Sequence, residues 1–417
     1  MKYVTLFSHN RSRSMDTIFR TYTFLVSLFV CLMGSSQTST FSVSGQILDR
    51  ETSEPIAFAS VYVQSESIGT TSNEEGLFVF HIPTGKEESS IIISIIGYAP
   101  ISKRANTFGK NQKIFLSAKT TDLDEVVLTA AKKKKLTAKA IVRKAYKNIE
   151  RNYPDQPYIL EGYVRDLQKE DEKFVEYLEC ASKLFYQAHT VKKEPLVELV
   201  EVKTNYLGKK HPWNKKSERK NSIIDLVEDD LIRFDYGSIK GKNGWKYELE
   251  GILPYGNGLV YKINCIDEPF QTSTLFVDTK TFAFVRIELT RKSIDNKSWA
   301  RRLTNGALQI YYNLVLEYQV YKGKMYLKYQ KEEDSWRIFE DLESNEILFT
   351  KYPKKELFIN KIIDDPENYP FEKNMDVGTS IENQANEYNA DFWDTYNIPT
   401  QTEKESKIIK ELRNRSN

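Results

Sequence analysis

The stretch Phe41-Ser-Val-Ser-Gly-Gln-Ile-Leu-Asp49 begins a series of short segments that decides the fold of the N-terminal part of the chain. Three more segments follow: Glu54-Pro-Ile-Ala-Phe-Ala-Ser-Val-Tyr-Val63, Gly69-Thr-Thr-Ser-Asn-Glu-Glu-Gly-Leu-Phe78 and Ile95-Ile-Gly-Tyr98. Polar side chains alternate with small or apolar ones in the first segment, as in a strand with one buried face. Glycine, proline and asparagine mark the turns between segments. The pattern predicts a small β-sandwich over residues 41–117, and it indicates no reaction.

As a set, these segments resemble the carboxypeptidase-regulatory-like domain, a seven-stranded sandwich of the transthyretin type. The resemblance implies an accessory domain that occurs beside metallocarboxypeptidases and at the front of many envelope proteins. Such a domain holds none of the catalytic groups of the peptidase. The matching residues are Val43, Gly45, Asp49, Pro55, Ala59, Val61, Gly69, Thr70, Gly76, Phe78, Pro83, Gly97 and Tyr98.

The composition indicates a globular chain of two or three domains. With 417 residues, each domain is long enough to bury its own core. Hydrophobic residues make up 40% and aromatic residues 12%, which is enough to offset the entropy of ordering most of the chain. Lysine and arginine number 60 against 58 acidic residues, so the formal net charge is +2. This balance gives no electrostatic argument for a nucleic-acid partner.

Residues 1–36 have the pattern of a secretory signal peptide. Basic residues between Arg11 and Arg20 precede an apolar run over residues 22–33, and small residues begin at Gly34. Met15 is an alternative start. An uncleaved membrane anchor is the alternative interpretation of the apolar run.

The stretch Leu123-Asp-Glu-Val-Val127 resembles the segment that follows this type of sandwich in TonB-dependent outer-membrane receptors. The remaining chain is too short for the plug and barrel of such a receptor, so only the front end is shared. Lysines at residues 132–135 indicate a solvated linker over residues 118–135. Together with the signal, the resemblance predicts an exported protein in the periplasm or associated with the outer membrane of a Gram-negative envelope.

Residues 136–362 predict a larger antiparallel α+β domain. Thr137 can cap a helix that has one apolar face, and Pro154 ends it. Segments of strand character follow, and turns at residues 278–281 and 322–324 join pairs of them as hairpins. The expected structure is a curved sheet with one packed helix. Its strand-rich, aromatic character is similar to that of the half-barrels that carry lipoproteins across the periplasm.

Residues 363–417 predict a polar C-terminal tail. Phe392 and Trp393 are a candidate anchor onto the body of the protein. A weak helix is expected from Thr402 to Arg413, with disorder as the alternative.

Two cysteines, Cys180 and Cys265, follow the signal. In an oxidising compartment they could pair. Both lie in segments of strand character, where cysteine behaves as a small hydrophobic residue, so buried thiols are the favoured interpretation.

No catalytic, cofactor-binding or metal-binding residue is predicted. His81, His189 and His211 belong to no zinc-binding or metalloprotease motif. The chain also lacks the Gly-x-Ser-x-Gly nucleophile elbow. A set of aromatic residues could line an apolar or sugar-binding pocket, with packing in the core as the alternative. These candidate ligand-binding residues are Trp245, Tyr247, Tyr255 and Tyr261.

The acidic cluster Asp225, Glu228, Asp229 and Asp230 is interpreted as the solvated face of a helix. Its spacing matches no calcium-binding loop. Carboxylate chemistry is the alternative interpretation. It requires that two acidic side chains converge in a cleft with raised pKa values.

These features predict a non-catalytic, exported cell-envelope protein that serves as a binding or structural module for a protein, glycan or lipid partner. Membrane association is left open, and no cofactor is expected. A periplasmic carrier of lipid or another apolar ligand is the alternative, and it requires a concave, poorly filled apolar hollow. A carboxylate-dependent hydrolase is the second alternative.

Overall fold

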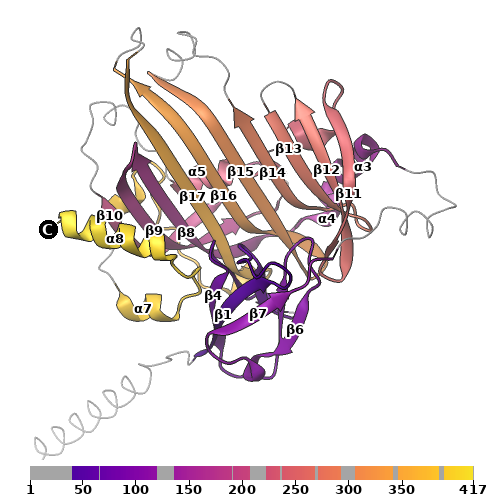
Figure 1. Cartoon of the computed structure of the whole chain (residues 1–417), viewed down its shortest axis with the longest axis horizontal. Helices are drawn as coiled ribbons and strands as arrows, with labels where there is room; N and C mark the ends of the chain where they lie inside the picture. The colour runs from indigo at the N-terminus through magenta and orange to yellow at the C-terminus, as the bar shows by residue number, and fades with distance from the viewer. Residues whose placement is uncertain are drawn as a thin grey trace, which may run out of the picture.

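The computed structural model describes residues 40–64, 66–119, 136–189, 191–206, 222–234, 237–267, 271–292, 306–340, 346–384 and 389–416. The predicted signal at residues 1–36 and most of the predicted linker at 118–135 lie outside the described residues. The described chain is mainly β, as the sequence predicts, with a small sandwich beside one large antiparallel sheet (Figure 1).

The N-terminal sandwich consists of seven strands in two sheets. One sheet has the order β4 (Leu77–Pro83), β1 (Thr40–Asp49), β7 (Gln112–Leu116), with β7 parallel to β1. The other has the order β3 (Gly69–Thr71), β2 (Ser60–Val63), β5 (Ser90–Ser94), β6 (Ile101–Arg104), and the short helix η1 (Ala105–Thr107) follows. Apolar side chains from both sheets form one core, including Val43, Ile47, Val61, Phe78 and Phe80, each at most 1% exposed.

The turn before β4 explains why Gly76 is one of the residues that identify the sandwich. Asn73 Oδ1 accepts hydrogen bonds from the backbone N–H groups of Glu75 and Leu77, which fixes the turn. Gly76 has φ +72°, and a Cβ there would lie 2.4 Å from the carbonyl oxygen of Ile47. Only glycine fits this position.

The large sheet has ten strands and is antiparallel throughout. Its order is β10-β9-β8-β17-β16-β15-β14-β13-β12-β11. The strands follow one another along the chain as a meander, but the first strand, β8, pairs with the last, β17. Among the described strands, β10 and β11 are consecutive in the chain but do not pair. The bounds are β8 (Tyr158–Glu170), β9 (Lys173–Tyr186), β10 (Leu196–Tyr206), β11 (Lys246–Tyr255), β12 (Gly258–Asp267), β13 (Gln271–Asp278), β14 (Phe284–Lys292), β15 (Ala307–Tyr321), β16 (Lys324–Phe339) and β17 (Ile347–Ile363).

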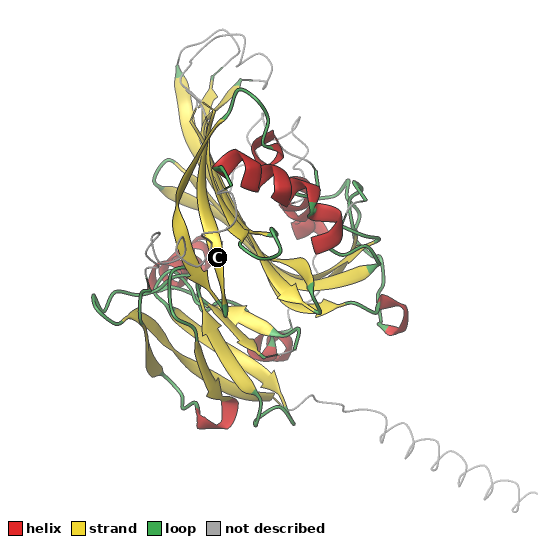
Figure 2. Cartoon of the chain, turned by 90° about the vertical axis from the view of Figure 1, so that its right-hand side faces the viewer, coloured by secondary structure: helices red, strands yellow, loops and turns green. Residues whose placement is uncertain are grey.

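Helices cover the concave face of this sheet (Figure 2). They are α3 (Ala138–Lys147) and α4 (Ile149–Asn152), which precede the sheet, and α5 (Ser222–Glu228) and η3 (Gly237–Lys240), which lie in the connection between β10 and β11. As predicted, the Thr137 side chain caps α3 by accepting from the N–H of Ala140. The predicted single helix is interrupted at Asn148, where α3 ends. The helices and the strands share one hydrophobic core.

The sandwich and the helices α7 (Ala390–Thr395) and α8 (Glu403–Ser416) lie against the convex face (Figure 1, Figure 2). The chain between β17 and α7 contains η4 (Pro366–Asn368) and η5 (Ile381–Gln384), and Ile381 of η5 packs into the core on the concave side. Phe58 leaves the sandwich at φ +58° and stacks on Tyr329 of β16, with ring centroids 5.3 Å apart. Trp393 of α7 is 7% exposed and packs edge-on against Tyr163 of β8. The predicted anchor at Phe392 and Trp393 is therefore confirmed.

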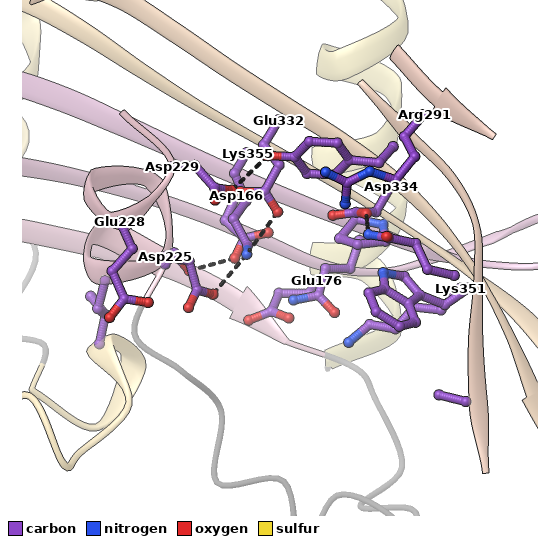
Figure 3. Close-up of a pocket in the computed structure, with 18 of the residues that line it drawn as sticks. Asp166, Glu176, Asp225, Glu228, Asp229, Arg291, Glu332, Asp334, Lys351 and Lys355 are labelled. Atoms are coloured by element: carbon purple, nitrogen blue, oxygen red, sulfur yellow. Dashed lines mark hydrogen bonds and ion pairs between the residues drawn. The ribbon is translucent and has the colours of Figure 1, made fainter. Parts of the chain in front are cut away.

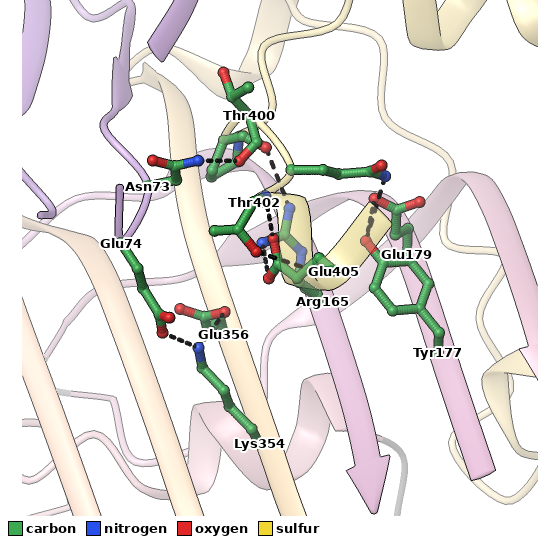
Figure 4. Close-up of polar contacts among 12 residues, drawn as sticks. Asn73, Glu74, Arg165, Tyr177, Glu179, Lys354, Glu356, Thr400, Thr402 and Glu405 are labelled. Carbon is green, nitrogen blue, oxygen red and sulfur yellow. Dashed lines mark hydrogen bonds and ion pairs between the residues drawn. The ribbon is translucent and has the colours of Figure 1, made fainter. Parts of the chain in front are cut away.

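A polar network at this junction joins the sandwich, the sheet and the tail (Figure 4). The Arg165 guanidinium, on β8, donates to Glu405 Oε1 over 2.9 Å and to the carbonyl oxygen of Pro399 over 3.2 Å. Asn73 donates to the carbonyl oxygen of Thr400, and Lys354 of β17 pairs with Glu74 over 2.7 Å. The arginine is 3% exposed, so this ion pair is part of the interior.

The tail is ordered more firmly than its polar composition predicts. Thr402 and Glu405 form a capping box, because each accepts a hydrogen bond from the backbone N–H of the other. Ile408, Ile409 and Leu412 are buried against Tyr177 of β9. The expected helix is therefore present as α8.

Both remaining cysteines are buried, and no disulfide joins them. Cys180 lies on β9 and Cys265 on β12, and burial raises the pKa of the Cys180 thiol. The favoured interpretation of buried thiols is confirmed.

The Arg165–Glu405 pair gives a test of this packing. We expect Glu405→Ala to lower the free energy of unfolding by roughly 3–5 kcal/mol, because it leaves a buried guanidinium without its carboxylate. The double variant Arg165→Met, Glu405→Leu replaces the pair with apolar side chains and should recover most of that loss. Urea unfolding of the full chain measures both, with Lys410→Ala on the exposed side of α8 as the control. If the single and the double variant lose the same free energy of unfolding, the unpaired guanidinium is not the cause of the loss.

Candidate functional site

The concave face contains a cavity of about 660 Å³ between α5 and the sheet. Strands from both ends of the meander contribute to its wall, because β8 and β9 meet β17, β16, β15 and β14 there (Figure 3). Nine carboxyl groups and three basic side chains line it. These are Asp166, Glu176, Asp225, Glu228, Asp229, Asp230, Glu332, Asp334, Glu382, Arg291, Lys351 and Lys355.

The strand register places the central charges in one row. Asp166 of β8 is opposite Lys355 of β17, and Lys355 is opposite Glu332 of β16. In the adjacent row on the same face, Asp334 of β16 is opposite Tyr312 of β15. Directly opposed side chains on one face have Cβ atoms about 5 Å apart, so the sheet itself brings these groups together.

Helix α5 and the turn after it supply the groups on the other side of the cavity. Ser222 donates to Asp166 Oδ2 over 2.5 Å, which ties the start of the helix to β8. Lys355 donates to Asp225 Oδ2 over 2.7 Å. Tyr312 donates to Asp229 Oδ2 over 2.8 Å. The charged groups of helix and sheet therefore face one another across a small space (Figure 3).

Two carboxyl groups in the cavity have pKa values near neutrality. Burial, together with the charge of Glu332, raises the pKa of Asp229 to about 7. Burial and the hydrogen bond with Glu332 raise the pKa of Asp334 to about 8. Burial also acts to raise the pKa of Glu332, but the Lys355 charge and its hydrogen-bonded neighbours bring that pKa below its usual value. Near neutral pH Glu332 is therefore ionised, whereas Asp334 holds a proton and Asp229 is partly protonated.

Next to the cavity, Asp230 belongs to a buried aromatic cluster. Tyr318 donates to Asp230 Oδ1 over 2.6 Å, and His189 stacks on Tyr153 with ring centroids 4.6 Å apart. Burial lowers the pKa of His189 to about 4, so its ring is neutral. Arg233 is 3% exposed and lies over the Tyr186 ring. These residues support the turn that carries Asp230.

The structure corrects the interpretation of the acidic cluster at residues 225–230. Asp230 is 6% exposed, and Asp225, Glu228 and Asp229 line the cavity, so this is not a solvated helix face. The physical reason is that α5 lies across the concave face of the sheet, against β16 and β17. The helix face that carries the carboxyls is turned toward the strands.

The four aromatic residues of the sequence prediction lie elsewhere. Trp245, Tyr247, Tyr255 and Tyr261 are partly buried against the large core, and none of them lines the cavity. Tyr247 donates to the carbonyl oxygen of Ser238, and Tyr255 to that of Tyr318. Their role in ligand binding stays a prediction.

Asp166, Glu332 and Asp334 were not singled out by the sequence analysis. They lie on strands far apart in the chain, and only the pairing of β8 with β17 brings them together. A carboxylate at an inward position of an otherwise apolar strand, such as Asp166 after Val164, is the signal that could have identified them.

Within the described part of the chain, no group of three or more histidine, cysteine or acidic residues is arranged to hold a metal ion. None of the helices in the same part of the chain combines the length and the apolarity that crossing a bilayer requires.

Comparison with known proteins identifies the sandwich. Residues 43–128 match the family model described as CarboxypepD_reg-like domain, so the chain carries a carboxypeptidase-regulatory-like domain at its N-terminal side. This match does not extend to the large sheet. No curated protein matches the chain.

Among solved structures, the chain is similar to a LolA superfamily protein from Nitrosomonas europaea. The identity is 11% over 55% of this chain and 94% of that chain, with a TM-score of 0.22. It is also similar to a DUF1329 family protein from Desulfovibrio piger, at 10% identity over 56% of this chain and 95% of that chain, with a TM-score of 0.24. At these TM-scores the similarities carry no argument about function.

The protonated state of Asp334 predicts a pH dependence of stability. The pKa is about 8 in the folded chain against 3.8 for an ordinary aspartate, so the stability that this group contributes at low pH is lost as the pH rises toward 8. We expect Asp334→Asn to be more stable than the wild type at about pH 8.5. The free energy of unfolding should differ by about 1.4 kcal/mol or more, which is the equivalent of one pKa unit. This advantage should be lost near pH 4, where the wild-type carboxyl is protonated.

Thermal unfolding between these pH values measures the effect. Asp365→Asn is the control, because Asp365 is exposed and its side chain makes no capping hydrogen bond. A constant difference in stability between Asp334→Asn and the wild type across the pH range would contradict the assignment.

Proposed function

We propose that this chain is an exported binding protein of the cell envelope that holds a polar ligand in the cavity on the concave face without transforming it. The observation that supports the proposal is the cavity itself. Its volume of about 660 Å³ is that of a typical small-molecule site. The secretory pattern of residues 1–36 and the sandwich found in many envelope proteins support export.

The lipid-carrier alternative finds less support from the packing. An apolar ligand needs an empty apolar hollow, but α3, α5 and η3 already cover the apolar part of the concave face. The space that remains is bounded by nine carboxyl groups, which disfavour the anionic phosphate headgroups of lipids. The carrier function stays a prediction.

A second candidate function is acid–base hydrolysis, because Asp229 and Asp334 converge in the cavity with raised pKa values beside the charged Glu332. This is the arrangement that the carboxylate alternative requires. One group that holds a proton and another that is ionised are also the minimum for general acid and base roles.

The two candidates predict different fates for a bound compound. We expect a compound from a soluble envelope extract to be recovered unchanged after prolonged incubation with the protein, with mass spectrometry as the measurement. If the wild type converts that compound and Glu332→Gln does not, the result would favour the hydrolase instead.

Filling the cavity tests the binding site directly. Ala307 lines the cavity at the start of β15, so Ala307→Trp should place an indole in the space that a ligand occupies. We expect retention of extract compounds to fall by roughly tenfold or more, which corresponds to about 1.4 kcal/mol. Native mass spectrometry of the purified full chain is the measurement.

Asn257→Trp, in the exposed hairpin between β11 and β12, adds the same side chain away from the cavity and is the matched control. Equal retention by the wild type and Ala307→Trp, both folded, would exclude this cavity as the ligand site.

A further inference from the structure

The charge of the cavity is unbalanced. Nine carboxyl groups line it against three basic side chains. Two of the basic groups are already engaged, because Lys355 pairs with Asp225 over 2.7 Å and lies 3.5 Å from Glu332 Oε1. Arg291 donates to Gln271 Oε1 and lies over the Tyr312 ring. Among the described residues, the lining therefore carries more acidic than basic groups.

Two buried carboxylate oxygens in the cavity lack a nitrogen or hydroxyl donor. Asp166 is 3% exposed and Glu332 is 6% exposed. Among the described residues, Asp166 Oδ1 accepts no hydrogen bond, and Glu332 Oε2 has no donor other than the carboxyl protons that Asp229 and Asp334 carry. A buried, ionised oxygen without a donor is costly, so a ligand that brings N–H donors would be stabilised at this point. Both groups line the cavity beside α5 (Figure 3).

The apolar and aromatic side chains around these carboxylates can pack against the alkyl chain of a ligand. Tyr312, Trp336, Leu289 and Ile338 line the same cavity. Aromatic faces attract cations, and apolar walls cover the methylene groups that carry them. A bare metal ion would gain nothing from these walls, and no metal-binding group is present among the described residues.

We propose that the cavity binds organic cations, in which ammonium or guanidinium groups on an alkyl chain donate to Asp166 Oδ1 and Glu332 Oε2 and the chain lies against Tyr312 and Trp336. The proposal names the ligand class of the site proposed above and rests on that function. Two sources supply this chemistry: a free polyamine, and the lysine or arginine side chains of a peptide.

The protonation of the site agrees with this ligand class. Asp229 faces Tyr312 on β15, Glu332 on β16 and Lys355 on β17, and Asp334 faces Glu332 and Lys355. The protons on Asp229 and Asp334 partly offset the acidic excess in the empty cavity. A bound cation lowers the pKa of both groups, so binding near neutral pH releases protons.

Isothermal titration calorimetry of the purified full chain tests the proposal, with spermidine and a capped Lys-Gly-Lys peptide as probes. A capped Gln-Gly-Gln peptide and calcium chloride are the comparison ligands. We expect at least one cationic probe to bind more tightly than both comparison ligands. The heat should depend on the ionisation enthalpy of the buffer, because protons are released. Binding of spermidine alone indicates a free polyamine, and binding of the peptide alone indicates a basic segment of a protein.

The double variant Asp166→Asn, Glu332→Gln removes both charges but retains the acceptor for Ser222 and leaves Asp225 to pair with Lys355. We expect it to weaken cation binding by roughly tenfold to a hundredfold, the value of one or two charge-assisted hydrogen bonds. Glu172→Gln, whose side chain is 91% exposed, is the charge-matched control. Thermal unfolding confirms that each variant is folded.

Three outcomes would overturn the proposal: cations that bind no more tightly than the glutamine peptide, binding of calcium alone, or equal affinities in the double variant and the wild type. These outcomes leave the proposed function testable on its own. If Ala307→Trp still abolishes retention of an extract compound while cations fail to bind, the cavity is a ligand site and only the ligand class is wrong.

Discussion

The pairing of β8 with β17 is the constraint on which the rest of the structure depends. It joins the first strand of the large sheet to the last, so the described strands form one curved sheet whose two edges are β10 and β11. The concave face then needs a cover, and the chain between β10 and β11 supplies it as α5 and η3. On the other face, the same two strands carry Arg165 and Lys354, which hold the tail and the sandwich. One strand pair therefore positions the core, the cavity and the domain junction.

The two faces of these strands use charge in different ways. On the convex face each buried charge has a defined partner, as Arg165 has Glu405, and the result is a fixed junction. On the concave face Asp166 Oδ1 and Glu332 Oε2 have no nitrogen or hydroxyl donor among the described residues, and burial raises the pKa values of Asp229 and Asp334 to about 7 and about 8. Satisfied groups fix a structure, whereas unsatisfied groups in a cavity favour a ligand. This contrast is the physical basis for placing function on the concave side.

Local signals predicted the local structure. Alternation and turn residues predicted the sandwich, Thr137 the start of α3, and the turns at residues 278–281 and 322–324 two hairpins. The capping box of Thr402 and Glu405 is also readable in the sequence, but the polar composition around it leaves disorder as an equal alternative to the helix. The candidate site could not be predicted in the same way, because Asp166 and Glu332 become neighbours only through a pairing that no local pattern encodes. The cluster at residues 225–230 was visible, but its partners were not.

The β8–β17 pairing also sets an order of events during synthesis. Asp166 is made long before Lys355, its neighbour across the two strands, and contacts between distant residues carry a cost in loop-closure entropy. The sandwich can fold as soon as residue 118 has emerged, whereas β8 keeps an unpaired edge until almost the whole chain has been made. Unpaired edges of this kind join with other chains. The interval between the two strands is therefore the time at which the nascent protein is most exposed to aggregation.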